Sequence, residues 1–231
     1  MIKLTFYIIL FLGFVMFSFL SFKERKRIVF LGDSITEAGI KPKGYISVLN
    51  EMLDAVGAAG KYELIGAGIS GNKVPDLQKR LEKDVLSKKP DLVVIYIGIN
   101  DVWHFYHDCC KNTVKGTSKD VFEAGLKDII GRIEKQGAEV ILCTPTVIGE
   151  KAPGDNELDD ELDAYADISR QVAKASHIEL LDLRKIFQEY IKDNLAKNTG
   201  SGILTYDGVH LNDVGNKFLA EQIYKVITAN E

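Results

Sequence analysis

Short apolar runs alternate with longer amphipathic segments along almost the whole chain from residue 28 onward. The apolar runs have the length and the nearly continuous hydrophobicity of strands that are buried on both faces of a sheet. They occupy residues 28–31, 62–66, 91–98, 139–145 and 178–183. The segments between them repeat apolar residues at helical spacing, as Val74, Leu77 and Leu81 do after the second run. This alternation predicts an α/β domain whose parallel sheet is covered by helices on both faces.

Two later segments show the same helical spacing. Residues 156–175 repeat apolar side chains every three or four positions, and so do residues 213–229. In the last segment we expect Val214, Phe218 and Ile223 to share the buried side. Ligands of parallel α/β sheets bind beyond the carboxyl ends of the strands, so the residues that follow each apolar run are the candidates for a functional site.

The first 27 residues differ from the rest of the chain. Residues 4–22 contain no charged side chain and are just long enough to span a bilayer, and residues 23–27 form a basic flank. A signal peptide and a membrane anchor both fit this pattern, because no clear small-residue cleavage site follows the apolar segment. The basic flank alone would place the body of an anchored protein in the cytoplasm. We assign residues 28–231 to one folded domain.

The charge of this domain argues against one class of partner. Residues 28–231 carry a net charge of −8 without a basic stripe, which disfavours nucleic acid binding. Residues 150–167 hold eight carboxylates and one lysine. We interpret this acidic run as the solvated start of a helix, where the helix dipole favours carboxylates, rather than as a metal site.

Ser34 directly follows the first apolar run, in the sequence GDSI at residues 32–35. A catalytic serine needs a base that takes its proton, a carboxylate that orients the base, and donors that hold the oxyanion. The G-x-S-x-G motif of many serine hydrolases is absent. Taken alone, a serine at this junction is more typical of a helix cap than of a nucleophile.

His210 is the best candidate for the base. It follows the last apolar run in the sequence DGVH, with Asp207 three residues before it. One turn of chain can bring this carboxylate to Nδ1 of the imidazole and leave Nε2 free to face a serine. Capping of the next helix is an equally good interpretation of the pair when it is considered alone.

Two further strand ends supply candidate oxyanion donors. Gly71 lies in GISGN after the second run, where a glycine can bring its backbone N–H close to a ligand. Asn100 lies in GIND after the third run and can offer its side-chain amide. Each could also serve only a turn or a loop cap. Independent caps and turns would not be expected to place a nucleophile, a base, an orienting carboxylate and two donors at one sheet edge.

These four stretches, in this order, resemble the sequence blocks of the SGNH or GDSL hydrolases, and the resemblance covers residues 28–229. It implies a flavodoxin-like, three-layer α/β/α fold with a five-stranded parallel sheet and no metal or other cofactor. It also implies an active site to which each of the four blocks contributes a catalytic residue or an oxyanion donor. Ser34 would be the nucleophile, His210 the base and Asp207 its orienting carboxylate, with the Ser34 and Gly71 N–H groups and the Asn100 amide as the oxyanion hole.

The resemblance implies a serine esterase that acts through an acyl-enzyme. Among small members of the family, DGVHLN followed by Gly215 and Asn216 is similar to short-chain acetyl esterases, some of which act on carbohydrates. We therefore expect a small-molecule or carbohydrate ester as substrate and an exported protein of the cell envelope or the extracellular space. If the protein is an enzyme, the alternative activity is that of a lysophospholipase or an arylesterase. If it is not an enzyme, the alternative is a membrane-tethered module that binds glycans without hydrolysing them.

Residues 101–120 are expected to form a wall of the substrate pocket. Trp103 and His104 are candidate substrate contacts, as is Asp33 beside the serine, although local packing explains the aromatic residues equally well. Several potential ligands in this segment also invite a metal site, but their spacing matches no common zinc pattern. They are His104, His107, Asp108, Cys109 and Cys110. We expect free thiols here and at Cys143, because a bridge between adjacent cysteines is strained.

Overall fold

The computed structural model describes residues 25–58, 60–106 and 115–229, and its strands form one sheet in which every pair is parallel. The strands are β1 (Lys26–Gly32), β2 (Tyr62–Gly68), β3 (Leu92–Tyr96), β4 (Glu139–Cys143) and β5 (Glu179–Leu181). Their order across the sheet is β2-β1-β3-β4-β5. Each strand coincides with one predicted apolar run, so the five-stranded parallel α/β sheet is confirmed.

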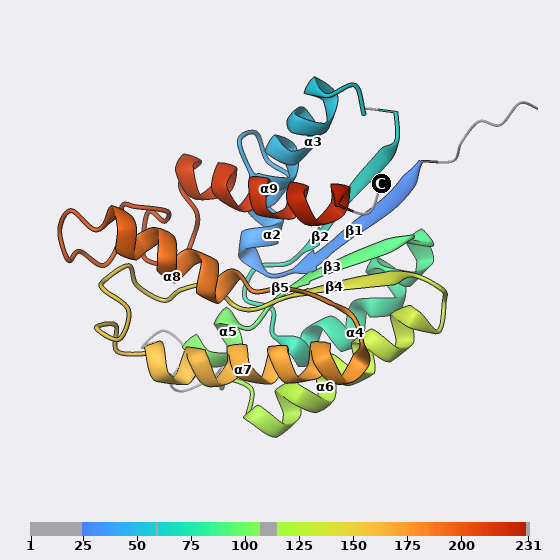
Figure 1. Cartoon of the computed structure of the whole chain (residues 1–231). Coiled ribbons are helices and arrows are strands. Elements are labelled where there is room, and N and C mark those ends of the chain that lie inside the picture. Colours follow the sequence, from blue (N-terminus) through green and yellow to red (C-terminus); the bar gives the residue numbers. More distant parts are fainter. Residues whose placement is uncertain (1–24, 59, 107–114, 230–231) are drawn as a thin grey trace, which may run out of the picture.

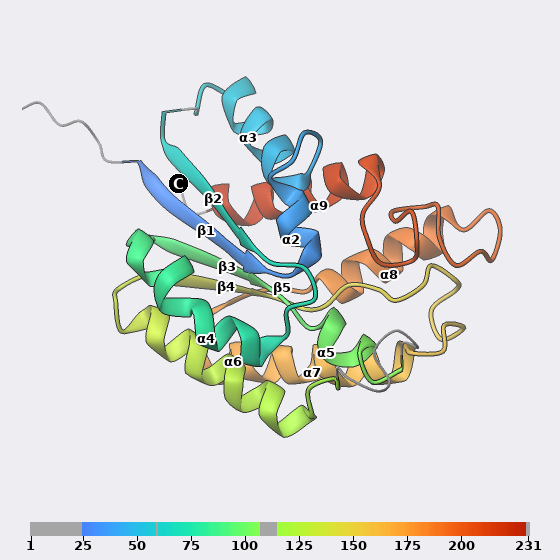
Figure 2. The same cartoon turned by 180° about the vertical axis from the view of Figure 1, so that it is seen from behind.

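Helices cover both faces of this sheet (Figure 1). One face carries α2 (Ser34–Gly39), α3 (Tyr45–Ala55), α8 (Leu183–Asn194) and α9 (Asp213–Thr228). The opposite face, seen again in Figure 2, carries α4 (Val74–Asp84), α6 (Lys119–Glu134) and α7 (Asp159–Ser176). The short helix α5 (Ile99–Trp103) follows β3, and a 3₁₀ turn (Leu86–Lys88) follows α4. These three layers are the flavodoxin-like arrangement that the family resemblance implies.

The inner strand β1 explains why the apolar runs are continuous rather than alternating. β1 pairs with β2 on one side and with β3 on the other, so that Ile28 lies between Leu64 and Leu92. The side chains of residues 28–31 are fully buried because helices cover both faces of the strand. The chain leaves each strand at the same edge of the sheet, where the loops gather on the left of Figure 1.

The predicted buried side of α9 is wrong at its first turn. Val214 is 51% exposed, whereas Leu219, Ala220, Ile223 and Ile227 are buried. An α-helix turns about 100° per residue, so nine positions place Val214 and Ile223 on opposite sides of the helix. The buried side therefore runs through Gly215, Leu219 and Ile223 from the first turn onward and excludes Val214.

Several predictions concern segments outside the described residues. The apolar segment 4–22 and the residues His107, Asp108, Cys109 and Cys110 lie there. Across residues 25–58, 60–106 and 115–229, no helix is long and apolar enough to cross a membrane. β1 begins at Lys26, so the sheet includes the end of the predicted basic flank.

Candidate active site

Ser34 is the first residue of α2 and lies directly beyond the end of β1. Asp33 caps this helix, because its Oδ1 accepts a hydrogen bond of 3.0 Å from the Ile35 N–H. The turn before it requires a glycine, since a Cβ on Gly32 would clash with the Thr36 side chain and the Tyr96 carbonyl. The sequence GDSI thus forms a tight strand-to-helix turn that leaves the serine half-buried at the edge of the sheet.

Ser34, His210 and Asp207 form one hydrogen-bonded chain. Ser34 Oγ lies 2.9 Å from His210 Nε2, and His210 Nδ1 lies 2.7 Å from Asp207 Oδ2. A carboxylate can only accept, so Nδ1 carries the imidazole proton and Nε2 is free to accept from the serine hydroxyl. The structure therefore brings the predicted nucleophile, base and orienting carboxylate together across 176 positions of sequence between Ser34 and His210.

The backbone around Asp207 keeps this carboxylate ionised. Its Oδ1 accepts hydrogen bonds from the Val209 N–H at 3.0 Å and the His210 N–H at 2.7 Å. Partial burial favours the protonated acid, but the hydrogen bonds from the His210 side chain and from these two N–H groups outweigh it and lower the Asp207 pKa. The spacing of three residues between Asp207 and His210 lets one turn of chain make all of these bonds.

Asn100 lies in α5 and Gly71 in the loop after β2, and hydrogen bonds tie both segments to the serine turn. Asn100 is 5% exposed, and its Nδ2 donates to the Asn72 carbonyl at 3.1 Å and more weakly to Asp33 Oδ2 at 3.4 Å. Gly71 has a φ of +76°, and a Cβ there would meet nothing within 4 Å, so the backbone conformation rather than space favours glycine. The structure thus connects the GDSI, GISGN and GIND stretches through hydrogen bonds.

Asp33, which was also expected to contact substrate, is buried beside the serine. The residue is 2% exposed and bonds to Ile35 and Asn100 instead of facing open space. Burial raises the pKa of its carboxyl to about 6, while the Ile35 N–H and the nearby His210 oppose this rise. Asp33 therefore contacts the helix N-terminus and the Asn100 amide, and its proposed contact with substrate stays a prediction.

Two aromatic rings flank the imidazole of His210. Tyr206 is 65% exposed and stacks on it, with ring centroids 5.8 Å apart and planes 16° from parallel. Trp103 lies on α5, with its ring centroid 6.5 Å from that of His210. Sequence reasoning named Trp103 but missed Tyr206, whose position directly before Asp207 was the available signal. His104 is half-buried at the end of α5, and its proposed contact with substrate stays a prediction.

An open groove of about 610 Å³ lies beside this site. Trp103 and Asp207 both line it, and the loop after β4 contributes Lys151 and Asn156 to its wall. The groove therefore offers polar and aromatic surface beside Asp207. Within the described part of the chain, no group of three or more histidine, cysteine, aspartate or glutamate side chains could hold a metal ion.

Arg80 on α4 is a residue that sequence reasoning missed. Its guanidinium donates to the carbonyls of Gly32 and Ala67, both at 2.8 Å, and to Asn72 Oδ1 at 2.7 Å. It thereby joins the ends of β1 and β2 to the loop that accepts the Asn100 amide. An arginine on the polar side of an amphipathic helix carries no sequence signal for such a role.

We expected the acidic run at residues 150–167 to be solvated, but part of it is buried. Glu150 is fully buried and Asp159 is 3% exposed. Asp159 forms an ion pair of 2.7 Å with the fully buried Arg184, which lies on α8. The interpretation holds for the four exposed carboxylates, Asp155, Glu157, Asp160 and Asp167, and is wrong for Glu150 and Asp159, whose partners come from distant parts of the sequence.

Known proteins share both this sequence pattern and this fold. Residues 30–218 match the GDSL-like lipase/acylhydrolase family. The chain is 31% identical to an acetylxylan esterase from Geobacillus stearothermophilus over 215 residues, which cover 87% of this chain and 94% of that protein. It is 27% identical to the mouse isoamyl acetate-hydrolyzing esterase 1 homolog over 209 residues, covering 84% and 78% of the two chains.

A crystal structure of the acetyl xylan esterase AlAXEase superposes with a TM-score of 0.83 at 45% identity, and covers 87% of this chain and 99% of that one. A match of this quality over nearly the whole described domain confirms the resemblance to SGNH or GDSL hydrolases. The chain belongs to the GDSL-like lipase/acylhydrolase family and is a carboxylic ester hydrolase.

Proposed function

We propose that the protein is a serine esterase that removes acetyl groups from carbohydrates, with Ser34 as nucleophile, His210 as base and Asp207 as the carboxylate that orients it. The observation that carries this proposal is the continuous chain of contacts from Ser34 Oγ through the imidazole to Asp207, at 2.9 and 2.7 Å. Both distances lie within ordinary hydrogen-bond range, which is the geometry that proton transfer from serine to histidine requires.

In the first half of the reaction, His210 Nε2 takes the proton of Ser34 as Oγ attacks the ester carbonyl. The Ser34 and Gly71 N–H groups and the Asn100 amide stabilise the resulting oxyanion. The tetrahedral intermediate then collapses, and His210 returns the proton to the departing sugar hydroxyl. An acetyl group remains on Ser34 Oγ.

In the second half, His210 takes a proton from water, whose oxygen attacks the acetyl carbonyl. Collapse of this second intermediate returns the proton from His210 to Ser34 and releases acetic acid, which loses its remaining proton to solvent. Asp207 stabilises the imidazolium that forms in both halves, and its lowered pKa keeps it charged for that purpose.

The proposed substrate rests on the relatives and on the surface around His210. Two relatives named above are acetylxylan esterases, and a third is named for an acetate ester. The flat rings of Tyr206 and Trp103 beside the imidazole can pack against the apolar faces of a sugar ring, and the polar groove next to Asp207 can accept hydroxyl groups. Export of the protein remains a prediction from residues 4–22.

A panel of esters tests this proposal. We expect the full chain to release acetate from acetylated xylo-oligosaccharides with a higher kcat/KM than from isoamyl acetate. An octanoyl ester and a lysophospholipid should be poor substrates. Ser34→Ala should be inactive toward all of them. Faster cleavage of the octanoyl ester or the lysophospholipid would refute the substrate class, and glycan binding without any hydrolysis would favour the non-catalytic module.

A further inference from the structure

A fully buried glutamate in the loop between β4 and α7 contacts the segment that carries the catalytic histidine. Glu150 Oε1 accepts hydrogen bonds from the N–H groups of Leu204 at 2.6 Å and Thr205 at 2.7 Å, and Oε2 accepts one from Ile203 at 2.7 Å. Three consecutive N–H groups therefore converge on one carboxylate that is 0% exposed. Burying a carboxylate is costly unless such bonds compensate it, so this contact is a specific feature of the fold.

The backbone of the same loop strengthens this contact. Glu150 N–H donates to the Gly200 carbonyl at 2.9 Å, and Gly149 N–H donates to the Gly208 carbonyl at 2.7 Å. The second bond reaches the residue that directly follows Asp207. The loop after β4 thus holds the segment 200–208 at its start, in its middle and beside the proposed catalytic carboxylate.

Further hydrogen bonds connect Thr205 to the catalytic turn and to His210. Thr205 Oγ1 accepts from the Gly208 N–H at 3.0 Å, and the Tyr206 N–H donates to the His210 carbonyl at 3.0 Å. Thr205 also pairs with Leu211 as an antiparallel bridge. Residues 205–211 therefore close into a short turn that carries Asp207 and His210, and Glu150 holds the first residue of that turn.

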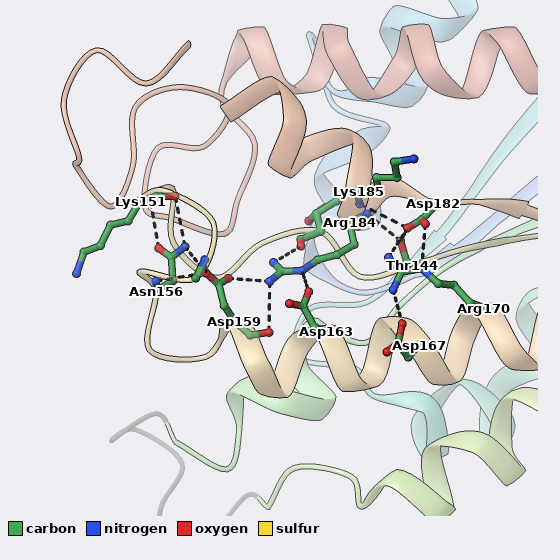
Figure 3. Close-up of polar contacts among 12 residues, drawn as sticks. Thr144, Lys151, Asn156, Asp159, Asp163, Asp167, Arg170, Asp182, Arg184 and Lys185 are labelled. Carbon is green, nitrogen blue, oxygen red and sulfur yellow. Dashed lines mark hydrogen bonds and ion pairs between the residues drawn. The ribbon is translucent and has the colours of Figure 1, made fainter. Parts of the chain in front are cut away.

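The loop that supplies Glu150 is itself anchored, as Figure 3 shows. The Arg184 guanidinium bonds to Asp159 Oδ1 at 2.7 Å and to the Thr146 carbonyl at 2.9 Å, which fixes both sides of the loop to α8. Asp159 Oδ2 accepts from Asn156 Nδ2 at 2.9 Å, and Asn156 Oδ1 accepts from the Lys151 N–H at 3.0 Å. Glu150 is thus presented from a rigid support rather than from a free loop.

We propose that Glu150 is a positioning residue for ester hydrolysis, because its carboxylate holds residues 203–205 so that Asp207 and His210 face Ser34. The inference rests on the proposed function, in which these three residues form the triad. Glu150 touches neither substrate nor the reacting atoms and acts only through the turn at residues 205–211. Its loss should therefore lower the rate of the chemical step and leave substrate affinity nearly unchanged.

Glu150→Gln tests the proposal, because glutamine keeps the size of the side chain but turns an NH₂ group toward an N–H donor. In the full chain, active sites are first counted by labelling with a fluorophosphonate. We then expect kcat for p-nitrophenyl acetate per labelled site to fall about ten- to a hundredfold, with KM within about twofold of the wild-type value. Glu82→Gln, the same substitution at an exposed position of α4, should leave both constants unchanged.

A wild-type kcat per labelled site in Glu150→Gln would overturn the proposal, whatever the melting temperature of the variant. If this variant does not fold, Glu150→Asp replaces it, because the shorter side chain keeps the carboxylate but cannot reach the N–H groups of Ile203, Leu204 and Thr205 together. We expect a lower kcat with an unchanged KM, and a wild-type kcat would again overturn the proposal. Ser34→Ala separates the two claims. Activity in Ser34→Ala would refute the triad itself. An inactive Ser34→Ala together with a fully active Glu150→Gln would refute only the role of Glu150.

Discussion

The free energy of unfolding of the wild-type protein should fall as the pH rises and Asp33 ionises. Replacing Asp33 with asparagine should abolish this part of the pH dependence. The Asp33 carboxyl is 2% exposed, and burial raises its pKa from 3.8 to about 6. The hydrogen bond from Ile35 and the nearby His210 oppose this rise without cancelling it. The folded protein therefore holds the Asp33 proton more tightly than the unfolded chain does.

The sign and size of the effect follow from this difference. A group whose pKa is higher in the folded state contributes stability that is fully present below its unfolded pKa of 3.8 and is lost as the pH rises through about 6. The difference is about two pKa units, each worth about 1.4 kcal/mol, so Asp33 should lower the free energy of unfolding by about 3 kcal/mol once it is fully ionised. Most of this change should occur between about pH 4 and pH 7.

Urea unfolding of both proteins at a series of pH values measures this contribution. The free energy of unfolding of wild type minus that of Asp33→Asn should fall by about 2–3 kcal/mol between about pH 4 and pH 7, because asparagine does not titrate. Asp101, whose pKa burial raises to about 7, is present in both proteins, so its titration cancels in the difference except for the part of its shift that the Asp33 charge causes. A difference that stays constant across this range, or one that increases with pH, would refute the reasoning.

Two other substitutions test separate parts of the site. Asn100→Ala removes a proposed oxyanion donor and should lower kcat for p-nitrophenyl acetate by about 10²–10³; a normal kcat in steady-state assays would remove Asn100 from the mechanism. Tyr206→Ala removes the exposed ring that stacks on His210. If that ring contributes about 1 kcal/mol to sugar binding, KM for acetylated xylo-oligosaccharides should rise about fivefold. KM for p-nitrophenyl acetate should not change, and equal effects on both substrates would contradict a role in sugar recognition.

The sequence predicted those features whose signal is local. The five strands are short, continuous apolar runs, and their parallel pairing places the segments that follow them at one edge. Asp207 and His210 are three residues apart, so a single turn of chain fixes their contact. Ser34 directly follows the β1 turn, but α8 separates His210 from the end of β5, so the pairing of the two residues depended on the ordered sequence blocks rather than on strand ends alone.

The features that could not be predicted depend on contacts between distant residues. Glu150 accepts hydrogen bonds from backbone N–H groups more than 50 positions later in the chain. Almost every residue type has such an N–H, so the sequence does not indicate which ones Glu150 contacts. Arg80 bonds to carbonyls of β1 and β2 for which any residue type would serve. The burial of Asp33 likewise depends on how α2 packs beside Asn100, which the GDSI motif alone does not reveal.

The central claim, that Ser34 carries out the hydrolysis of acetylated carbohydrates, is tested most directly by titrating the full chain with a fluorophosphonate. In each sample, peptide mass spectrometry gives the fraction of chains labelled at Ser34, and an acetate assay gives the remaining rate on acetylated xylo-oligosaccharides. We predict that the rate falls in proportion to labelling at Ser34 and reaches zero when labelling is complete. Activity that persists at full labelling, or an inhibitory adduct on another residue, would contradict this account.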